Sequence, residues 1–163
     1  MVALTAEELL VWAEKTAAGW RVLVEQQPEI LELPCDVRET QSVAGLLQHV
    51  VAVELRYAER LSDLPETPYA DIPMGSGGEI FATHDRAMGL LKKLLEVPRA
   101  DWEEEIEFTT RSAGKLCASR RAVFIHLLMH GIRHYAQLAT LVREHGIRPG
   151  WQMDYLGIWM KQA

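Results

Sequence analysis

The chain is poor in cysteine, and this excludes two classes of small protein. Its two cysteines, Cys35 and Cys117, lie far apart and outside any Cys-x-x-Cys motif. The sequence therefore indicates neither a disulfide framework nor a cysteine-ligated zinc site. We expect both cysteines to be reduced structural residues, with a reactive thiol as the alternative.

Basic clusters and long apolar runs are also missing. The chain has 17 Lys and Arg against 23 Asp and Glu, a formal net charge of -6, and Arg120-Arg121 is only a pair. We therefore expect no nucleic-acid partner. No segment has the length of a membrane span, and the acidic start, with Glu7 and Glu8 before Leu9-Leu10-Val11-Trp12, is unlike a signal peptide. These features predict a cytoplasmic protein that does not enter a membrane.

Hydrophobic residues are abundant, and their spacing is helical. They make up 48% of the 163 residues, enough for one domain over residues 1–163 with its own core. Capping signals at Thr5-Ala-Glu-Glu8, Asp36-Val-Arg-Glu39 and Ser76-Gly-Gly-Glu79 each precede an apolar helical pattern. The sequence predicts long helices over about residues 5–27, 37–62, 76–97 and 119–145.

The connections between these helices differ in kind. Residues 63–78 contain three prolines and three glycines and predict a long loop, either functional or disordered. Residues 101–119 alternate partly and predict a short hairpin, in which Glu103-Glu104-Glu105 is a solvated face. Residues 151–159 predict a final short helix docked through Tyr155, Leu156, Ile158 and Trp159. The fold class is thus all-α, a four-helix bundle with unequal connections.

Three of the six histidines fall four residues apart in the last long helix, at His126, His130 and His134. On a helical wheel centred on Leu127, His134 lies about 20° and His130 about 60° from the centre of the apolar face, and His126 about 100°. His130 and His134 therefore point inward and could share one metal ion. The alternative is a pair of core histidines with hydrogen-bonded rings. His126 and His134, about 12 Å apart along the helix, are not expected to share an ion.

A third ligand has to come from elsewhere, and the second helix offers His49. On a wheel centred on Val50, His49 lies about 100° and Glu54 about 40° from the centre of the apolar face. Residues 46–55 are apolar nearly all round, so this helix should touch several neighbours, and the flank with His49 can face the last long helix. An exposed or half-buried His49 is the alternative. His84, in the third helix, is expected to be partly exposed.

These residues carry a family resemblance. The segments are Leu-Leu-Gln-His49-Val-Val-Ala-Val-Glu-Leu-Arg-Tyr, His126-Leu-Leu-Met-His-Gly-Ile-Arg-His-Tyr-Ala-Gln-Leu, Gly146-Ile-Arg-Pro-Gly and Asp154-Tyr-Leu. Together they resemble the DinB/YfiT-like family of metal-dependent four-helix bundles. The resemblance implies a divalent ion, zinc or nickel, held by His49, His130 and His134. His126 and Gln137 would be pocket residues or neighbours of the ligands. The family pattern His-Arg-Gly-Gln is His134-Tyr-Ala-Gln137 here, so two positions differ.

A site of three histidines leaves coordination positions for water or substrate, as in catalytic rather than structural zinc sites. Glu54 could accept a proton there, and its alternative interpretation is a salt bridge or a solvent-facing residue. The resemblance implies a thiol-dependent S-transferase, an isomerase or a hydrolase that acts on a small molecule such as a low-molecular-weight thiol, and a homodimer. The alternatives are a non-catalytic metal-binding module for stress response or interaction, and a helical interaction domain without metal.

Overall fold

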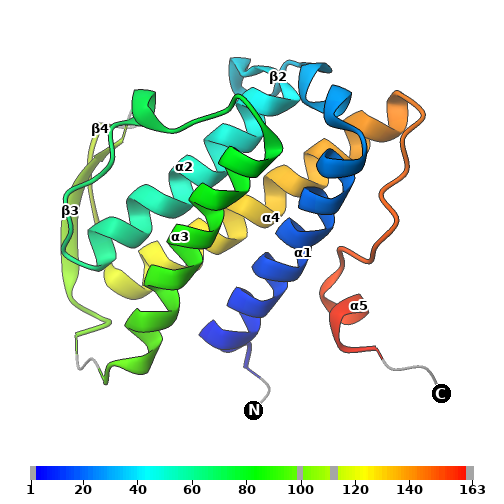
Figure 1. Cartoon of the computed structure of the whole chain (residues 1–163). Coiled ribbons are helices and arrows are strands. Elements are labelled where there is room, and N and C mark those ends of the chain that lie inside the picture. The colour runs from blue at the N-terminus through cyan, green and yellow to red at the C-terminus, as the bar shows by residue number, and fades with distance from the viewer. Residues whose placement is uncertain (1–2, 99–100, 111–113, 161–163) are drawn as a thin grey trace.

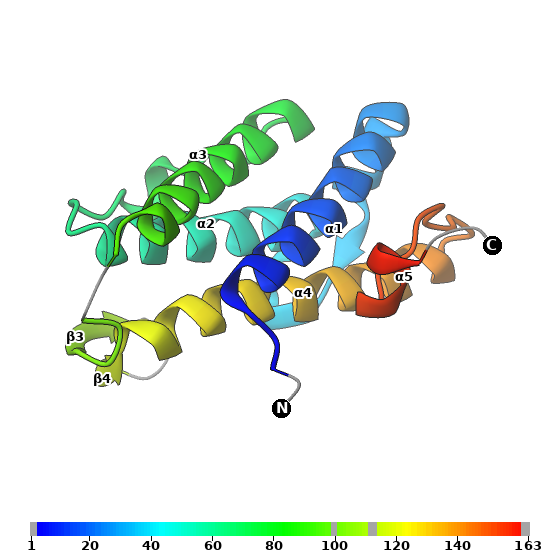
Figure 2. The same ribbon diagram turned by 90° about the horizontal axis from the view of Figure 1, so that it is seen from below.

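The computed structural model describes residues 3–98, 101–110 and 114–160, and most of them are helical. Four long helices lie side by side: α1 (Ala6–Gln26), α2 (Val43–Leu61), α3 (Gly77–Glu96) and α4 (Arg120–Glu144). α1 and α4 run in one direction and α2 and α3 in the other (Figure 1). α1 and α2 each pack against both α3 and α4 (Figure 2). The described chain is thus mostly helical, as the all-α class predicts, and it also has a short fifth helix and two small antiparallel sheets.

Serine or threonine side chains cap three of the four long helices at their predicted starts. Thr5 and Glu8 form a complete capping box before α1. The Ser76 hydroxyl accepts a hydrogen bond from the backbone of Glu79 before α3, and Ser119 does the same for α4 with Ala122. Each cap satisfies a backbone N–H that has no partner inside its helix.

The predicted start of the second helix, near residue 37, is wrong. α2 begins at Val43 with Ser42 as its cap. Arg38, Glu39 and Gln41 have positive φ, which cannot continue an α-helix. The segment instead contains the 3₁₀ turn η2 (Val37–Glu39), between β1 (Pro34–Cys35) and β2 (Gln41–Ser42), which pair as a two-residue antiparallel ladder. It follows η1 (Pro28–Glu32), which Pro28 opens directly after α1.

The connection from α2 to α3 is anchored by a buried carboxylate. It crosses the length of the helices through the 3₁₀ turn η3 (Tyr69–Asp71), as the parallel directions of α2 and α3 require (Figure 1). Glu59 is fully buried and accepts hydrogen bonds from the backbone and the hydroxyl of Thr67 and from Arg86. These bonds fix a segment for which the sequence left disorder open.

The predicted hairpin before α4 is confirmed. It consists of β3 (Glu105–Thr110) and β4 (Gly114–Ser119), paired antiparallel with Glu105 opposite Ser119. Its expected turn falls largely on residues 111–113, which lie outside the described residues. The run from Glu103 to Glu105 is exposed, as predicted, and Glu103 pairs with Arg121. Cys117 on β4 is exposed and Cys35 is buried, so the structural role expected for both fits only Cys35.

α5 (Tyr155–Trp159) is only partly docked, which corrects the expectation for its apolar residues. Tyr155 packs edge-on against Trp12 of α1, with ring centroids 5.5 Å apart. Leu156 and Trp159, however, are 70% and 46% exposed. A helix of five residues turns only one side to its neighbour, so its remaining apolar side chains stay in solvent. In the described ranges, no helix is both long and apolar enough to cross a membrane.

Candidate metal centre

Three histidine side chains from two helices meet at one point between α2 and α4. The Nε2 atom of His130 lies 3.2 Å from Nε2 of His49 and 3.1 Å from Nε2 of His134. One ligand atom from each of the three lies within 4.8 Å of the others. His134 and His130 are buried and His49 is half-buried. The structure thus brings together the three histidines that the sequence proposed, although they are up to 85 residues apart in the chain.

The spacing of these nitrogens fits a shared metal ion. Nε2 atoms that bind one zinc ion tetrahedrally, each about 2.1 Å from it, lie roughly 3.4 Å from one another. Two observed separations, 3.1 and 3.2 Å, are close to this value. Among the residues that the structure describes, this is the group whose ligand atoms could hold an ion. His126 does not belong to it, in line with its position two helical turns from His134.

Gln137 sets the orientation of one of these rings. The Nδ1–H of His134 donates to Oε1 of Gln137 over 2.6 Å, one helical turn further along α4. With the proton on Nδ1, the lone pair of His134 is on Nε2, the atom that faces the other two histidines. Hydrogen bonds of this kind orient metal-ligating histidines and increase their basicity.

The environment keeps two of the rings neutral, as metal ligands have to be. Burial, together with the positive charges that His134 and His49 would carry, lowers the pKa of His130 to about 2. Burial also lowers the pKa of His134, against the opposing effect of its hydrogen bond to Gln137. Protons are therefore weak competitors for these two nitrogens at neutral pH.

Helix packing explains how His49 reaches this point from the flank of its helix. α2 contacts α3 on one side and α4 on the other. The apolar surface of α2 extends nearly all round, so it packs against both of these helices. Val50 and Val51, which are neighbours in the chain, are accordingly both completely buried. His49 lies on the side that faces α4, where its ring meets His130 and His134 at centroid distances of 4.9 and 5.2 Å.

Comparison with known proteins agrees with this geometry. The sequence model of the DinB family matches residues 1–161. The chain belongs to the DinB family. The resemblance found in the histidine segments is thereby confirmed over almost the whole chain, and a histidine cluster that could hold a metal fits a DinB protein. Comparison with curated proteins gives no match.

Glu54, the proton acceptor suggested for this DinB chain, is engaged elsewhere. Its Oε2 accepts a hydrogen bond from Nδ1 of His84 over 2.7 Å, and the two side chains are 1% and 4% exposed. The expectation of a partly exposed His84 is therefore wrong. α3 packs against both α1 and α2, so its buried face is wider than its apolar stripe and includes His84. Of the two alternatives for Glu54, the salt bridge is observed and the solvent-facing residue is not.

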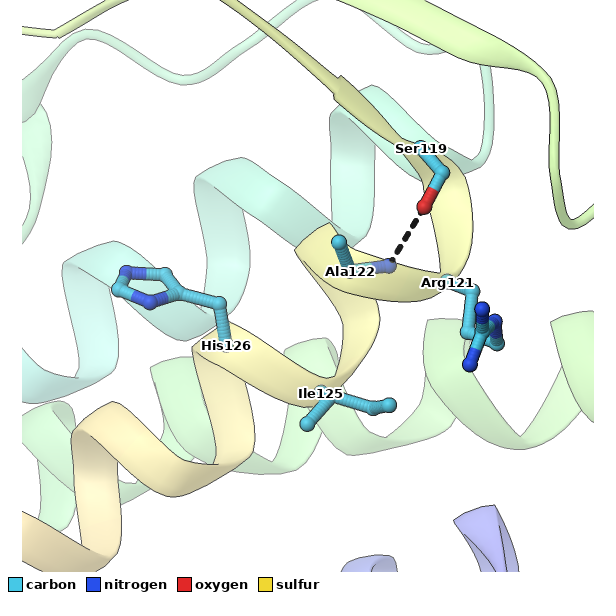
Figure 3. Close-up of a pocket in the computed structure, with 5 residues that line it drawn as sticks. All are labelled: Ser119, Arg121, Ala122, Ile125 and His126. Carbon is cyan, nitrogen blue, oxygen red and sulfur yellow. Dashed lines mark hydrogen bonds between the residues drawn. The ribbon is translucent and has the colours of Figure 1, made fainter.

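His126 lies between the histidine cluster and a pocket on the surface of the DinB chain. Its ring centroid is 5.6 Å from that of His130 and 5.9 Å from that of Tyr57. The pocket, of about 370 Å³, is lined by the end of β4 and the first turns of α4, where His126 and Ile125 point in different directions (Figure 3). The lining residues are Ser119, Arg121, Ala122, Ile125 and His126.

Sequence reasoning missed two side-chain contacts, one of Arg133 and one of His84. Arg133 donates a hydrogen bond from Nη2 to Nε2 of His134 over 3.2 Å. The one indication of this contact in the sequence is that Arg133 precedes His134 directly. This indication is weak, because adjacent residues on a helix point about 100° apart. The pairing of His84 with Glu54 joins residues 30 apart and depends on how α2 and α3 pack.

Proposed function

We propose that this DinB protein is a metal-dependent enzyme that acts on a small molecule. His49, His130 and His134 would hold a divalent ion, zinc or nickel, inside a four-helix bundle formed by α1–α4. The convergence of the three Nε2 atoms supports this proposal more than any other feature. A divalent ion with three protein ligands acts as a Lewis acid and lowers the pKa of a water or thiol bound to it.

Other residues of the chain would orient a ligand, line the substrate pocket and transfer a proton. Gln137 holds the proton of His134 on Nδ1, which leaves Nε2 as a ligand. His126 forms one wall of the adjacent pocket and touches the ring of His130, so a substrate in that pocket would lie next to the centre. The role of Glu54 as a proton acceptor remains a prediction. Its carboxylate is buried and accepts a hydrogen bond from His84.

The reaction class comes from the family resemblance alone. A thiol-dependent S-transfer or a hydrolysis, with a low-molecular-weight thiol as partner, is the reaction we propose to test first. The homodimer and the cytoplasmic location are proposals of the same kind. Sedimentation of the purified protein tests the dimer.

A non-catalytic metal module is the second candidate, and one observation favours it. The histidines come from α2 and α4, so an ion bound to all three would tie these helices together. Metal binding and folding energy would then be linked. In that case chelation would lower stability strongly, while added small ligands would not exchange at the metal.

The decisive experiment combines metal analysis with turnover. Untagged protein is analysed for metal as purified and after incubation with zinc or nickel, beside His49→Ala, His130→Ala and His134→Ala. His145→Ala, which removes an exposed histidine at the end of α4, is the control. We expect about one ion per chain, lost in the three variants and kept in the control. Loaded and metal-free protein are then compared with thiol-transfer and ester substrates, and equal turnover in both would refute a metal-dependent enzyme.

A further inference from the structure

A guanidinium group lies directly beside the three histidines. Arg133 is exposed, and its Nη2 lies 3.2 Å from Nε2 of His134, one of the nitrogens that point to the shared centre.

Arg133 is one of four described arginines without a carboxylate in an ion pair, together with Arg38, Arg143 and Arg148, and it is the one bonded to a histidine of the cluster. Six other arginines form ion pairs with carboxylates in the structure, whereas none of the described carboxylates forms an ion pair with Arg133. The six are Arg21, Arg56, Arg60, Arg86, Arg120 and Arg121. In a chain with an excess of acidic residues, Arg133 keeps its donors for a ring nitrogen and for solvent.

A second exposed arginine precedes the helix that carries His49. It is Arg38, in the 3₁₀ turn η2 before α2. Its backbone φ is 52°, in the left-handed region that non-glycine residues seldom adopt. Within the described ranges, Arg38 has no carboxylate in an ion pair either.

We propose that Arg133 is an anion-binding residue of this centre and that the substrate carries a carboxylate. The proposal rests on the proposed function, because a metal ion at the histidines would be a second cation beside the guanidinium. Two cations so close repel each other unless an anion lies between them. A carboxylate suits this position, since it accepts two parallel hydrogen bonds from a guanidinium. Arg38 contributes charge at longer range.

The test measures ligand binding rather than turnover. Cobalt(II), which accepts the imidazole ligands of zinc, is loaded into the protein, and its visible absorption is followed during titration with acetate, with inorganic phosphate and with imidazole. The variants are Arg133→Gln, Arg133→Lys and Arg38→Gln. Arg143→Gln is the matched control, because it removes an exposed arginine further along the same helix.

We expect acetate to bind about tenfold more weakly to Arg133→Gln than to the parent protein. Arg133→Lys should lose less, since it keeps the charge, and Arg38→Gln should also lose less. Imidazole, which is neutral, should bind alike to all of them, which shows that the metal site itself is intact. Equal acetate binding in Arg133→Gln and Arg143→Gln would overturn this inference and leave the proposed function standing. If phosphate bound in a manner that depends on Arg133 and acetate did not bind, the proposal that the anion is a carboxylate would be overturned. Failure of cobalt and zinc to bind at all would overturn the proposed function, and this inference with it.

Discussion

The Nδ1 of His134 and the Oε1 of Gln137 are joined by a 2.6 Å hydrogen bond along one turn of α4. Replacing Gln137 by Leu removes the acceptor and frees the ring to rotate or to change its tautomer. We expect metal affinity to fall about 10- to 100-fold, measured by competition with a chromophoric chelator. Thr140→Ala, one turn further along, should leave affinity unchanged. Unchanged affinity in Gln137→Leu would mean that packing alone orients His134.

Metal should stabilise the folded protein increasingly as its free concentration rises above Kd. An ion that binds only the folded state raises the free energy of unfolding by about 2.7 kcal/mol when its free concentration is roughly a hundredfold above Kd. Thermal unfolding with increasing zinc, and again with excess chelator, measures this effect. His49→Ala should respond much less, because α2 no longer supplies a ligand. An equal response in that variant would show that the ion binds elsewhere.

Gly131 is needed where α4 meets Glu54. A Cβ atom at this position would lie 3.1 Å from Oε1 of Glu54, whose other oxygen is held by His84, and 3.6 Å from Cγ1 of Val50. We expect Gly131→Ala to lower the free energy of unfolding by about 1–3 kcal/mol, even though alanine favours helix.

Gly89→Ala in α3 is the control for this substitution, since nothing lies within 4 Å of its Cβ position. It should raise the free energy of unfolding by up to about 1 kcal/mol. Denaturant unfolding measures both variants. Stabilisation by both would show that the contact between Gly131 and Glu54 relaxes without cost.

The ion pair of Glu54 and His84 should make stability depend on pH. Burial lowers the pKa of His84, but the charge and hydrogen bond of Glu54, helped by Asp85, outweigh it and raise the pKa above 6.5. The folded protein thus keeps a proton that the unfolded chain releases. The resulting stabilisation is complete below about pH 6.5 and is lost as pH rises through the pKa of the folded state.

This is measured in metal-free protein by comparing the free energy of unfolding of the parent and of His84→Gln across that pH range. The difference between the two should shrink as pH increases above about 6.5. His145→Gln, which removes an exposed histidine at the end of α4, is the control variant. A constant difference for His84→Gln would contradict a proton shared between Glu54 and His84.

Local sequence signals predicted much of the helical framework. A capping residue and the apolar residues after it lie within a few positions of one another, so Thr5, Ser76 and Ser119 mark their helices without help from the rest of the chain. The signal at Asp36 was wrong because it, too, depends only on neighbouring residues. It is a local pattern that the β1–β2 ladder and the positive φ of Arg38 override.

The histidine pair shows how far periodicity reaches. His130 and His134 share a face because the α-helix repeats every 3.6 residues, and this was readable from their spacing. The contact of His49 with this pair was not readable from the sequence. A helical wheel places His49 on a flank of its helix and does not show which neighbouring helix covers that flank. The packing of α2 between α3 and α4 determines that α4 covers this flank.

The environment of each polar side chain depended on tertiary packing in the same way. Sequence spacing assigns a residue to a face of its own helix, but burial and partners come from the helix opposite. His84 is buried because α3 packs against two helices and Glu54 faces it from α2. Thus the spacing of residues along the chain specified the helices and two of the three histidines. The third histidine, the Glu54–His84 pair and the place of Arg133 exist only where separate helices meet.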